Sequence, residues 1–195
     1  MSQSPAPPEV DTSAPSTLGV GVIVWLSSEL MFFAGLFAAY FTLRSVNEVW
    51  PPADVHLTTA RTGLATLVLV ASSGTMHLAV SAASRGEDTA ERRRALNWLG
   101  VTALLGLLFL SNQILEYTDP ALRIDQEAYG SAFFLLTGFH GLHVFGGLLF
   151  MAGVALAIAG ASRAPAHPSV EVCAYYWHFV DVVWVAMFTI IYVVQ

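Results

Sequence analysis

The sequence predicts an all-α integral membrane protein, a bundle of five transmembrane helices with its N-terminus in the cytoplasm and its C-terminus outside. Of its 195 residues, 55% are hydrophobic and only 11% are charged, whereas a soluble domain carries about 25% charged residues. The charges gather in short clusters between long apolar stretches. Five of these stretches reach the ~20 residues that a helix needs to cross the hydrocarbon core. Composition, clustering and length together indicate that a lipid bilayer surrounds most of the chain.

The segment before the first apolar stretch, residues 1–17, is expected to be a disordered N-terminal tail. It contains four prolines, the acidic residues Glu9 and Asp11, and no basic residue. A secretory signal needs a positively charged start and a cleavage site. We therefore expect the first span to stay in the mature protein, and the membrane domain to occupy residues 18–195.

The membrane domain is predicted to hold five spans joined by short connections. The expected spans are residues 18–43, 58–84, 95–117, 130–161 and 172–194. Three of the connections contain prolines, which interrupt a helix because they lack the backbone N–H. The remaining connection, residues 85–94, is strongly charged (RGEDTAERRR).

The arginines set the predicted orientation, since the chain contains no lysine. Basic residues accumulate on the cytoplasmic side of membrane proteins. The connections on the same side as the N-terminus carry Arg85, Arg92, Arg93, Arg94 and Arg163, and the opposite side carries Arg44, Arg61 and Arg123. This bias places the N-terminus in the cytoplasm.

Composition argues against two kinds of function. The net charge of −6 and a pI near 5.4 do not suit a nucleic-acid partner, which requires a basic surface. A single cysteine, Cys173, cannot form an internal disulfide, a thiolate pair for copper or an iron–sulfur site.

Glu29, in the segment WLSSELMFF, lies near the middle of the first span. Ionisable groups at this depth are costly and usually face protein, water or a lipid headgroup. Two interpretations follow. The simpler is a protonated carboxyl group hydrogen-bonded to a neighbouring helix, and the other is a proton-relay or lipid-contact site.

Four histidines and one aspartate also lie within predicted spans. His140 and His143 are three residues apart in GFHGLHVFGG, as are His178 and Asp181 in YYWHFVDVVW, and His77 lies in the second span. Residues at this spacing share a helical face. A closed metal site needs about four ligands, so we favour a polar seam that packs helices together. Axial ligation of a haem by His77 and His140 stays open, because spacing alone does not exclude it.

Four segments together resemble subunit III of the haem-copper oxidases. They are WLSSELMFF, NEVWPPADVH, QILEYTDP followed by YGSAFFLLTGFHGLHVFGG, and YYWHFVDVVW. They cover most of residues 22–194 in the family's order and spacing. The longer family members have seven helices, and this chain begins where their third would start. It is therefore similar to the short, five-helix bacterial forms.

The resemblance implies a non-catalytic subunit of a proton-pumping oxidase that reduces oxygen to water in a bacterial plasma membrane. Such a subunit binds the flank of subunit I alongside subunit II and other subunits. It holds structural phospholipid and supports proton uptake, while the haems and copper stay in subunits I and II. Glu29 matches the family's intramembrane carboxylate. Arg163 lies where the family has a lipid-headgroup contact, or is an ordinary positive-inside residue.

Several alternatives stay open from the sequence. The equivalent subunit of a quinol oxidase or of a nitric oxide reductase-associated complex would show the same segments, since other subunits choose the electron donor. Membership of a respiratory supercomplex is undecided. Outside the family, the alternatives are a stand-alone haem-binding membrane cytochrome and a small transporter, although transporters often show internal repeats and none is evident here.

Overall fold

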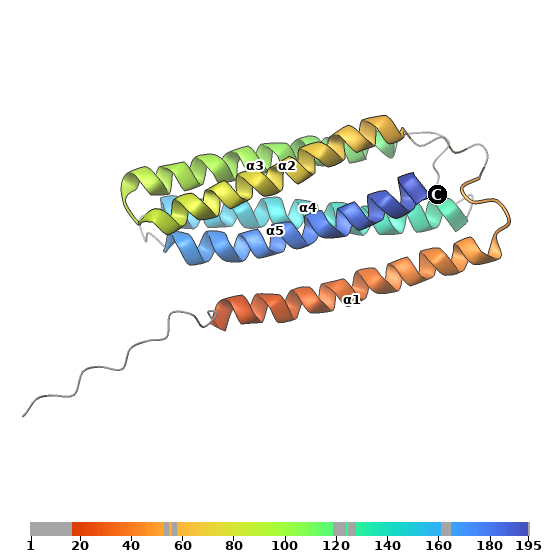
Figure 1. The fold of residues 1–195 in the computed structure, drawn as a ribbon, viewed down its shortest axis with the longest axis horizontal. Coiled ribbons are helices and arrows are strands. Elements are labelled where there is room, and N and C mark those ends of the chain that lie inside the picture. The colour runs from red at the N-terminus through yellow and green to blue at the C-terminus, as the bar shows by residue number, and fades with distance from the viewer. Residues whose placement is uncertain are drawn as a thin grey trace, which may run out of the picture.

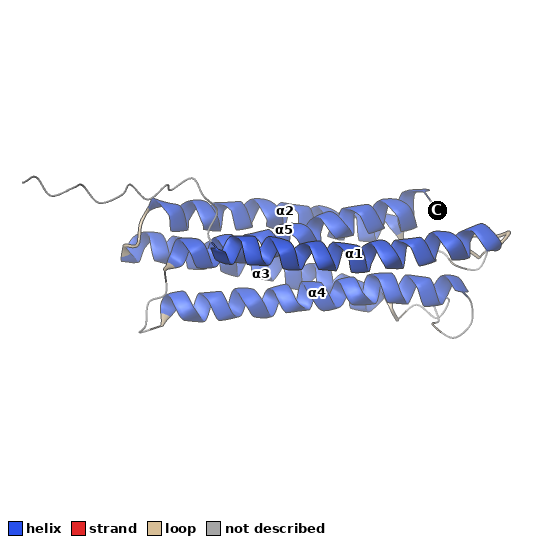
Figure 2. Cartoon of the chain, turned by 90° about the horizontal axis from the view of Figure 1, so that it is seen from below, coloured by secondary structure: helices blue, strands red, loops and turns tan. Residues whose placement is uncertain are grey.

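Five long helices make up the described part of the computed structural model, which covers residues 17–52, 55, 58–118, 124, 128–160 and 165–194 (Figure 1). In chain order they are α1 (Thr17–Val46), α2 (Thr59–Arg85), α3 (Thr89–Glu116), α4 (Ala128–Ala159) and α5 (Ala166–Phe188), which continues into the π-helical segment η1 (Thr189–Val194). Each is long and apolar enough to span a membrane. The predicted all-α, five-span fold is thereby confirmed, and Figure 2 shows helices and loops but no strand in the described ranges. Of the expected tail, residues 1–17, only Thr17 is described, as the first residue of α1; the rest of that tail and Arg163 lie outside the described residues.

Two helices begin six residues earlier than hydropathy predicts. The first turns of α3 include the charged residues after Asp88, whose side chain accepts a hydrogen bond from the Glu91 N–H (2.8 Å). This is an N-cap, which starts a helix whatever the polarity of the following turn. Helix α5 starts at Ala166 and holds Pro168 in its first turn, where the missing N–H of proline needs no partner.

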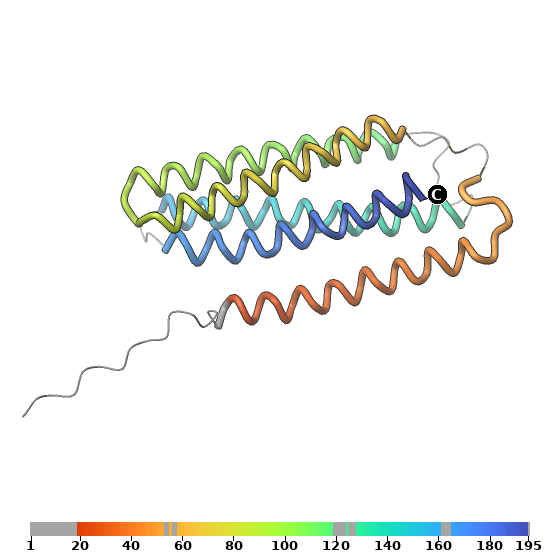
Figure 3. Tube along the Cα trace, viewed as in Figure 1, coloured from red at the N-terminus to blue at the C-terminus, as the bar shows by residue number. Residues whose placement is uncertain are grey.

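Helices α2 to α5 form a four-membered ring, and α1 lies outside it. Helix α2 packs against α3 and α5, and α4 packs against the same two, so that α2 and α4 are diagonal. Helix α1 contacts α4 and α5 (Figures 1 and 3). Successive helices run antiparallel, and α1 begins at the end of the bundle opposite to the C-terminus (Figure 3).

Trp177 of α5 fills the centre of the ring. Its indole ring lies so close to two glycines that a Cβ at Gly106 of α3 would be 2.6 Å from the ring, and one at Gly147 of α4 would be 2.9 Å from it. Its Nε1–H donates to Ser72 Oγ of α2 (2.9 Å). One side chain therefore joins four helices, and small residues on α3 and α4 make room for it.

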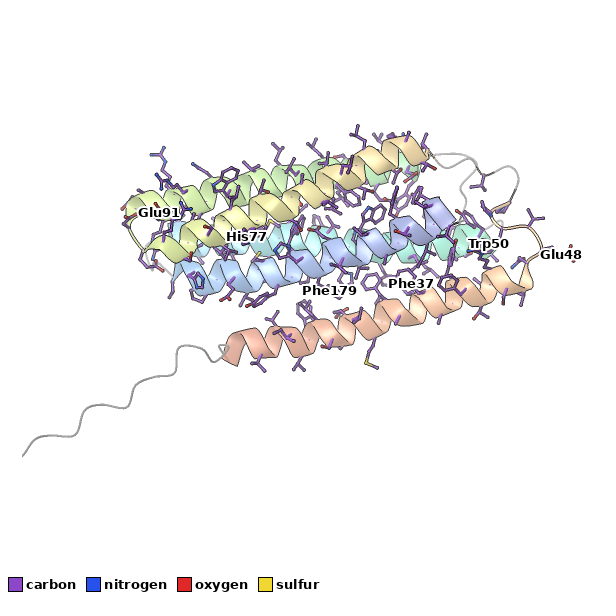
Figure 4. The ribbon with its side chains drawn as sticks, in the orientation of Figure 1. Phe37, Glu48, Trp50, His77, Glu91 and Phe179 are labelled. Atoms are coloured by element: carbon purple, nitrogen blue, oxygen red, sulfur yellow. The ribbon has the colours of Figure 1, made fainter. Side chains whose placement is uncertain are left out.

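Helix α1 contacts the ring along one narrow stripe. Its buried apolar residues Leu26, Phe33 and Tyr40 are seven residues apart, which keeps them on one side of the helix. Aromatic side chains fill the seam with α5, where Phe37 and Phe179 lie between the two helices (Figure 4). The remaining surface of α1 is exposed in the isolated chain.

A charged clamp closes the end of the bundle where α2 joins α3. Glu87 accepts a hydrogen bond from the Ala166 N–H at the start of α5 (3.0 Å) and pairs with Arg92 (2.5 Å). Arg92 also donates to the Ile158 carbonyl near the end of α4 (3.2 Å). An acid at a helix N-terminus and a base at a C-terminus both complement the helix dipoles, so the clamp ties the α2–α3 connection to the end of α4 and the start of α5.

Candidate functional site

The first candidate site is an acid–histidine pair between α1 and α4. Helix α1 carries Glu29 on the same stripe as Leu26 and Phe33, facing α4. Glu29 Oε2 lies 3.2 Å from His143 Nε2, and the two side chains remain 23% and 17% exposed, respectively. The structure thus gives Glu29 a hydrogen-bonded partner on a neighbouring helix.

The second nitrogen of His143 determines how this pair holds protons. His143 Nδ1 lies 2.7 Å from the Phe139 carbonyl oxygen, and because a carbonyl only accepts, Nδ1 must carry a proton. The contact between Nε2 and Glu29 then needs one further proton, on either the carboxyl group or the ring. Both arrangements leave the pair with no net charge, which allows a carboxyl group to lie at membrane depth.

Aromatic rings lie beside the pair. Phe33 meets the His143 ring edge-on at 5.0 Å, and Trp25 stacks on Tyr176 of α5 at 5.5 Å. The Tyr176 hydroxyl donates to the His143 carbonyl oxygen (3.0 Å). Because Glu29 stays partly exposed, a lipid or water molecule can reach it at the seam between α1 and α4.

The second candidate site joins α2 and α5. His178 Nδ1 lies 2.9 Å from Ser73 Oγ, and Ser73 Oγ donates to Asp181 Oδ2. A hydroxyl group has one hydrogen, so His178 Nδ1–H must be the donor to Ser73. Hydrogen bonds therefore run from His178 through Ser73 to Asp181. His77 follows Ser73 by one turn on α2 and is exposed (Figure 4).

His140 lies inside the ring and does not join His143. It is fully buried; its imidazole stacks on Trp184 with ring centroids 4.9 Å apart, and meets Phe109 edge-on at 5.9 Å. Trp184 is held in turn by its Nε1–H bond to Thr66 Oγ1 (2.9 Å). Three residues along a helix differ by about 60° in direction, and here that difference sends the two histidines into different interfaces.

The placement of the histidines bears on metal and haem binding. Within the described ranges, no three histidine, cysteine or acidic side chains gather as a metal site would require. His77 and His140 belong to α2 and α4, which are diagonal in the ring. A haem bound to His140 would have to displace the rings of Phe109 and Trp184, which cover it.

Glu116 is a buried carboxyl group that sequence reasoning missed. It lies at the end of α3, where its Oε1 accepts from Thr62 Oγ1 (3.0 Å) and its Oε2 from the Tyr192 hydroxyl (2.7 Å). The sequence shows only a glutamate at the end of an apolar span, where side chains are commonly solvated. Its partners, Thr62 on α2 and Tyr192 on η1, come from distant parts of the chain.

Comparison with known proteins points to one family. The family model for cytochrome c oxidase subunit III matches residues 10–195. The probable cytochrome c oxidase subunit 3 of Mycobacterium tuberculosis is 46% identical over 186 residues, which cover 93% of this chain and 90% of that protein. The cytochrome c oxidase subunit 3 of Corynebacterium diphtheriae is 43% identical over 188 residues (93% and 90%), and that of Synechocystis is 40% identical over 179 residues (88% and 73%).

Proposed function

The chain belongs to the cytochrome c oxidase subunit III family, and from that premise we propose that it is an accessory, non-catalytic subunit of its oxidase. In this proposal it lies in a bacterial plasma membrane and binds subunit I as its main contact, with subunit II and further subunits nearby. The haems and copper that reduce oxygen stay in subunits I and II. This chain stabilises subunit I, holds structural phospholipid and supports proton uptake.

The Glu29–His143 pair is the observation that carries the proposal. It combines a hydrogen bond between an acid and a histidine with partial exposure at the seam between α1 and α4. A proton can pass between the carboxyl group and the imidazole of such a pair without changing its net charge, which avoids an isolated charge in the bilayer. A phospholipid lying along α1 would contact the same seam. Arg163, near the end of α4 in sequence, is the proposed headgroup contact.

The contacts of the other histidines support a role for the chain without a redox centre. His178 Nδ1 is bonded to Ser73, and His140 is covered by Phe109 and Trp184. These contacts support a role of the rings in helix packing. The polar seam inferred from the sequence is accordingly proposed to hold the helices in register.

The arginine distribution supports a cytoplasmic N-terminus. Arg85 and the run of arginines at 92–94 lie at the end of the bundle where α1 begins, whereas Arg44 and Arg61 lie at the other end. Positive residues on the cytoplasmic side then place the end of η1 outside the cell.

Co-purification tests the proposed function. Tagged chain is extracted from membranes in mild detergent, and the eluate is examined by visible absorption and mass spectrometry. We expect haem bands together with large oxidase subunits, and a colourless chain once a harsher detergent has removed those subunits. Haem that stays with the isolated chain would favour a membrane cytochrome, and a colourless eluate without partners would refute the proposal.

The same eluate identifies the electron donor. A soluble copper domain on the co-purified subunit II would indicate cytochrome c. Its absence would indicate a quinol oxidase.

A further inference from the structure

The outer surface of α2 and α5 is hollowed at the second acid–histidine site. The pocket has a volume of about 270 Å³, and its lining combines three polar and three apolar side chains: Ser73, His178, Asp181, Val70, Val182 and Val185. It opens to the outside of the bundle near the middle of both helices. The side of the ring occupied by α1 is a different one.

Asp181 has an incomplete set of hydrogen bonds at this pocket. Its side chain is only 5% exposed, and Oδ2 accepts from Ser73. Oδ1 is buried and has no hydrogen-bond partner in the described parts of the chain. A buried oxygen without a donor is destabilising, so Oδ1 is available to accept a hydrogen bond from a group outside the described residues.

Two outward-facing hydroxyl groups on other helices bond to the backbone of their own helix. The Ser28 hydroxyl on α1 donates to the Trp25 carbonyl (2.6 Å), and the Ser111 hydroxyl on α3 donates to the Leu107 carbonyl (2.8 Å). Such groups can face lipid tails at little cost. Ionisable side chains, in contrast, almost always face protein or water inside a membrane, so the pocket on α2 and α5 calls for a polar cover.

We propose that this pocket docks a transmembrane helix of another oxidase subunit, which places a hydroxyl- or amide-bearing side chain against Asp181. The inference rests on the proposed function, because it requires partner subunits. Lipid tails offer no donor, and lipid headgroups lie at the membrane surface rather than at this depth. Water alone also suits the pocket poorly, since half of its lining is valine. A polar side chain on an apolar helix fits both the walls and the unpartnered oxygen.

Photocrosslinking in the complete oxidase tests the occupant. A photoreactive phenylalanine analogue replaces Val182 at the pocket wall. In a matched control, the same analogue replaces Leu156 on α4. The native side chains at these positions are 69% and 73% exposed, so neither is needed for folding. We expect the probe at 182 to attach to a transmembrane segment of another subunit, within one helical turn of a hydroxyl or amide side chain. Adducts at 182 with lipid only, with a second copy of this chain or with a wholly apolar segment would overturn the inference.

A steric variant asks whether the contact holds the complex together. Val182→Trp fills the pocket, and Leu156→Trp adds the same bulk elsewhere. We expect haem recovered per tagged chain in mild detergent to fall by about fivefold or more in Val182→Trp relative to Leu156→Trp, since overpacking costs upward of about 1 kcal/mol. If the wild-type chain brings down haem and the two variants recover equal amounts of it, the inference is overturned. Failure of the wild type itself would refute the proposed function, and this inference with it.

Discussion

Gly106→Ala tests whether the close fit around Trp177 holds the helix ring together. The added methyl carbon would lie 2.6 Å from Trp177 Cη2, 3.0 Å from Cζ2 and 3.2 Å from Leu148 Cδ2. Carbon atoms pack best at about 3.5–4.0 Å, so the methyl group is roughly 1 Å too close to a rigid ring. Either α3 must move away from α5, or the indole must shift and stretch its bond to Ser72.

The expected loss in the free energy of unfolding follows from these two ways of relieving the clash. Overpacking a filled core costs about 1–3 kcal/mol, and losing an interhelical hydrogen bond in a membrane protein costs about 0.6 kcal/mol on average. We expect the free energy of unfolding to fall by about 1–3 kcal/mol. For a chain of this size, that corresponds to a melting temperature lower by about 2–12 °C.

The assay is the melting temperature of the tagged chain in its detergent-solubilised complex, followed by size-exclusion chromatography after heating. Gly100→Ala on the same helix is the matched control, because a Cβ there meets nothing within 4 Å. Adding Trp177→Phe should reduce the cost of Gly106→Ala, since the smaller ring leaves room for the methyl group. If Gly106→Ala and Gly100→Ala melted at the same temperature, the argument from the close fit would be refuted.

Three further substitutions are expected to separate the roles of individual polar groups. Glu29→Gln cannot share a proton with His143 as the carboxyl group does, so we expect normal assembly and initial oxygen consumption, but faster loss of activity during sustained turnover or less bound phospholipid. Glu87→Gln removes the ion pair with Arg92 at a half-exposed position, so the melting temperature should fall by the equivalent of about 0.5–1 kcal/mol. Tyr192→Phe deprives Glu116 of a buried donor and should cost about 1 kcal/mol in the same assay.

Each of these has its own control and contrary result. Tyr175→Phe removes an exposed hydroxyl bonded to Glu171 and should leave the melting temperature unchanged, so an equal loss in Tyr192→Phe and Tyr175→Phe would contradict the role of Glu116. Unchanged melting of Glu87→Gln would mean that the clamp is not needed. If Glu29→Gln matched the wild type in initial rate, sustained rate and lipid content, its functional role would be abandoned.

The placement of individual polar groups shows where sequence reasoning stops. Glu29 could be located at membrane depth from its position within an apolar stretch, but its partner lies 114 positions away on α4. His140 and His143 share a helical face by spacing, yet one enters the ring and the other meets α1. Spacing along one helix gives only the relative direction of two side chains. Which residues each side chain contacts is set by packing between helices.

Sequence by itself determined the number of spans, their approximate bounds and the family, since each depends on features within single segments. A helix in lipid satisfies its own backbone hydrogen bonds, so an apolar stretch of sufficient length suffices to predict it. The tertiary structure alone decided that α1 lies outside the ring, that Trp177 fits between Gly106 and Gly147, and that Glu116 is buried. Each of these depends on surfaces brought together from distant parts of the chain, and shape complementarity between such surfaces cannot be inferred from any one of them.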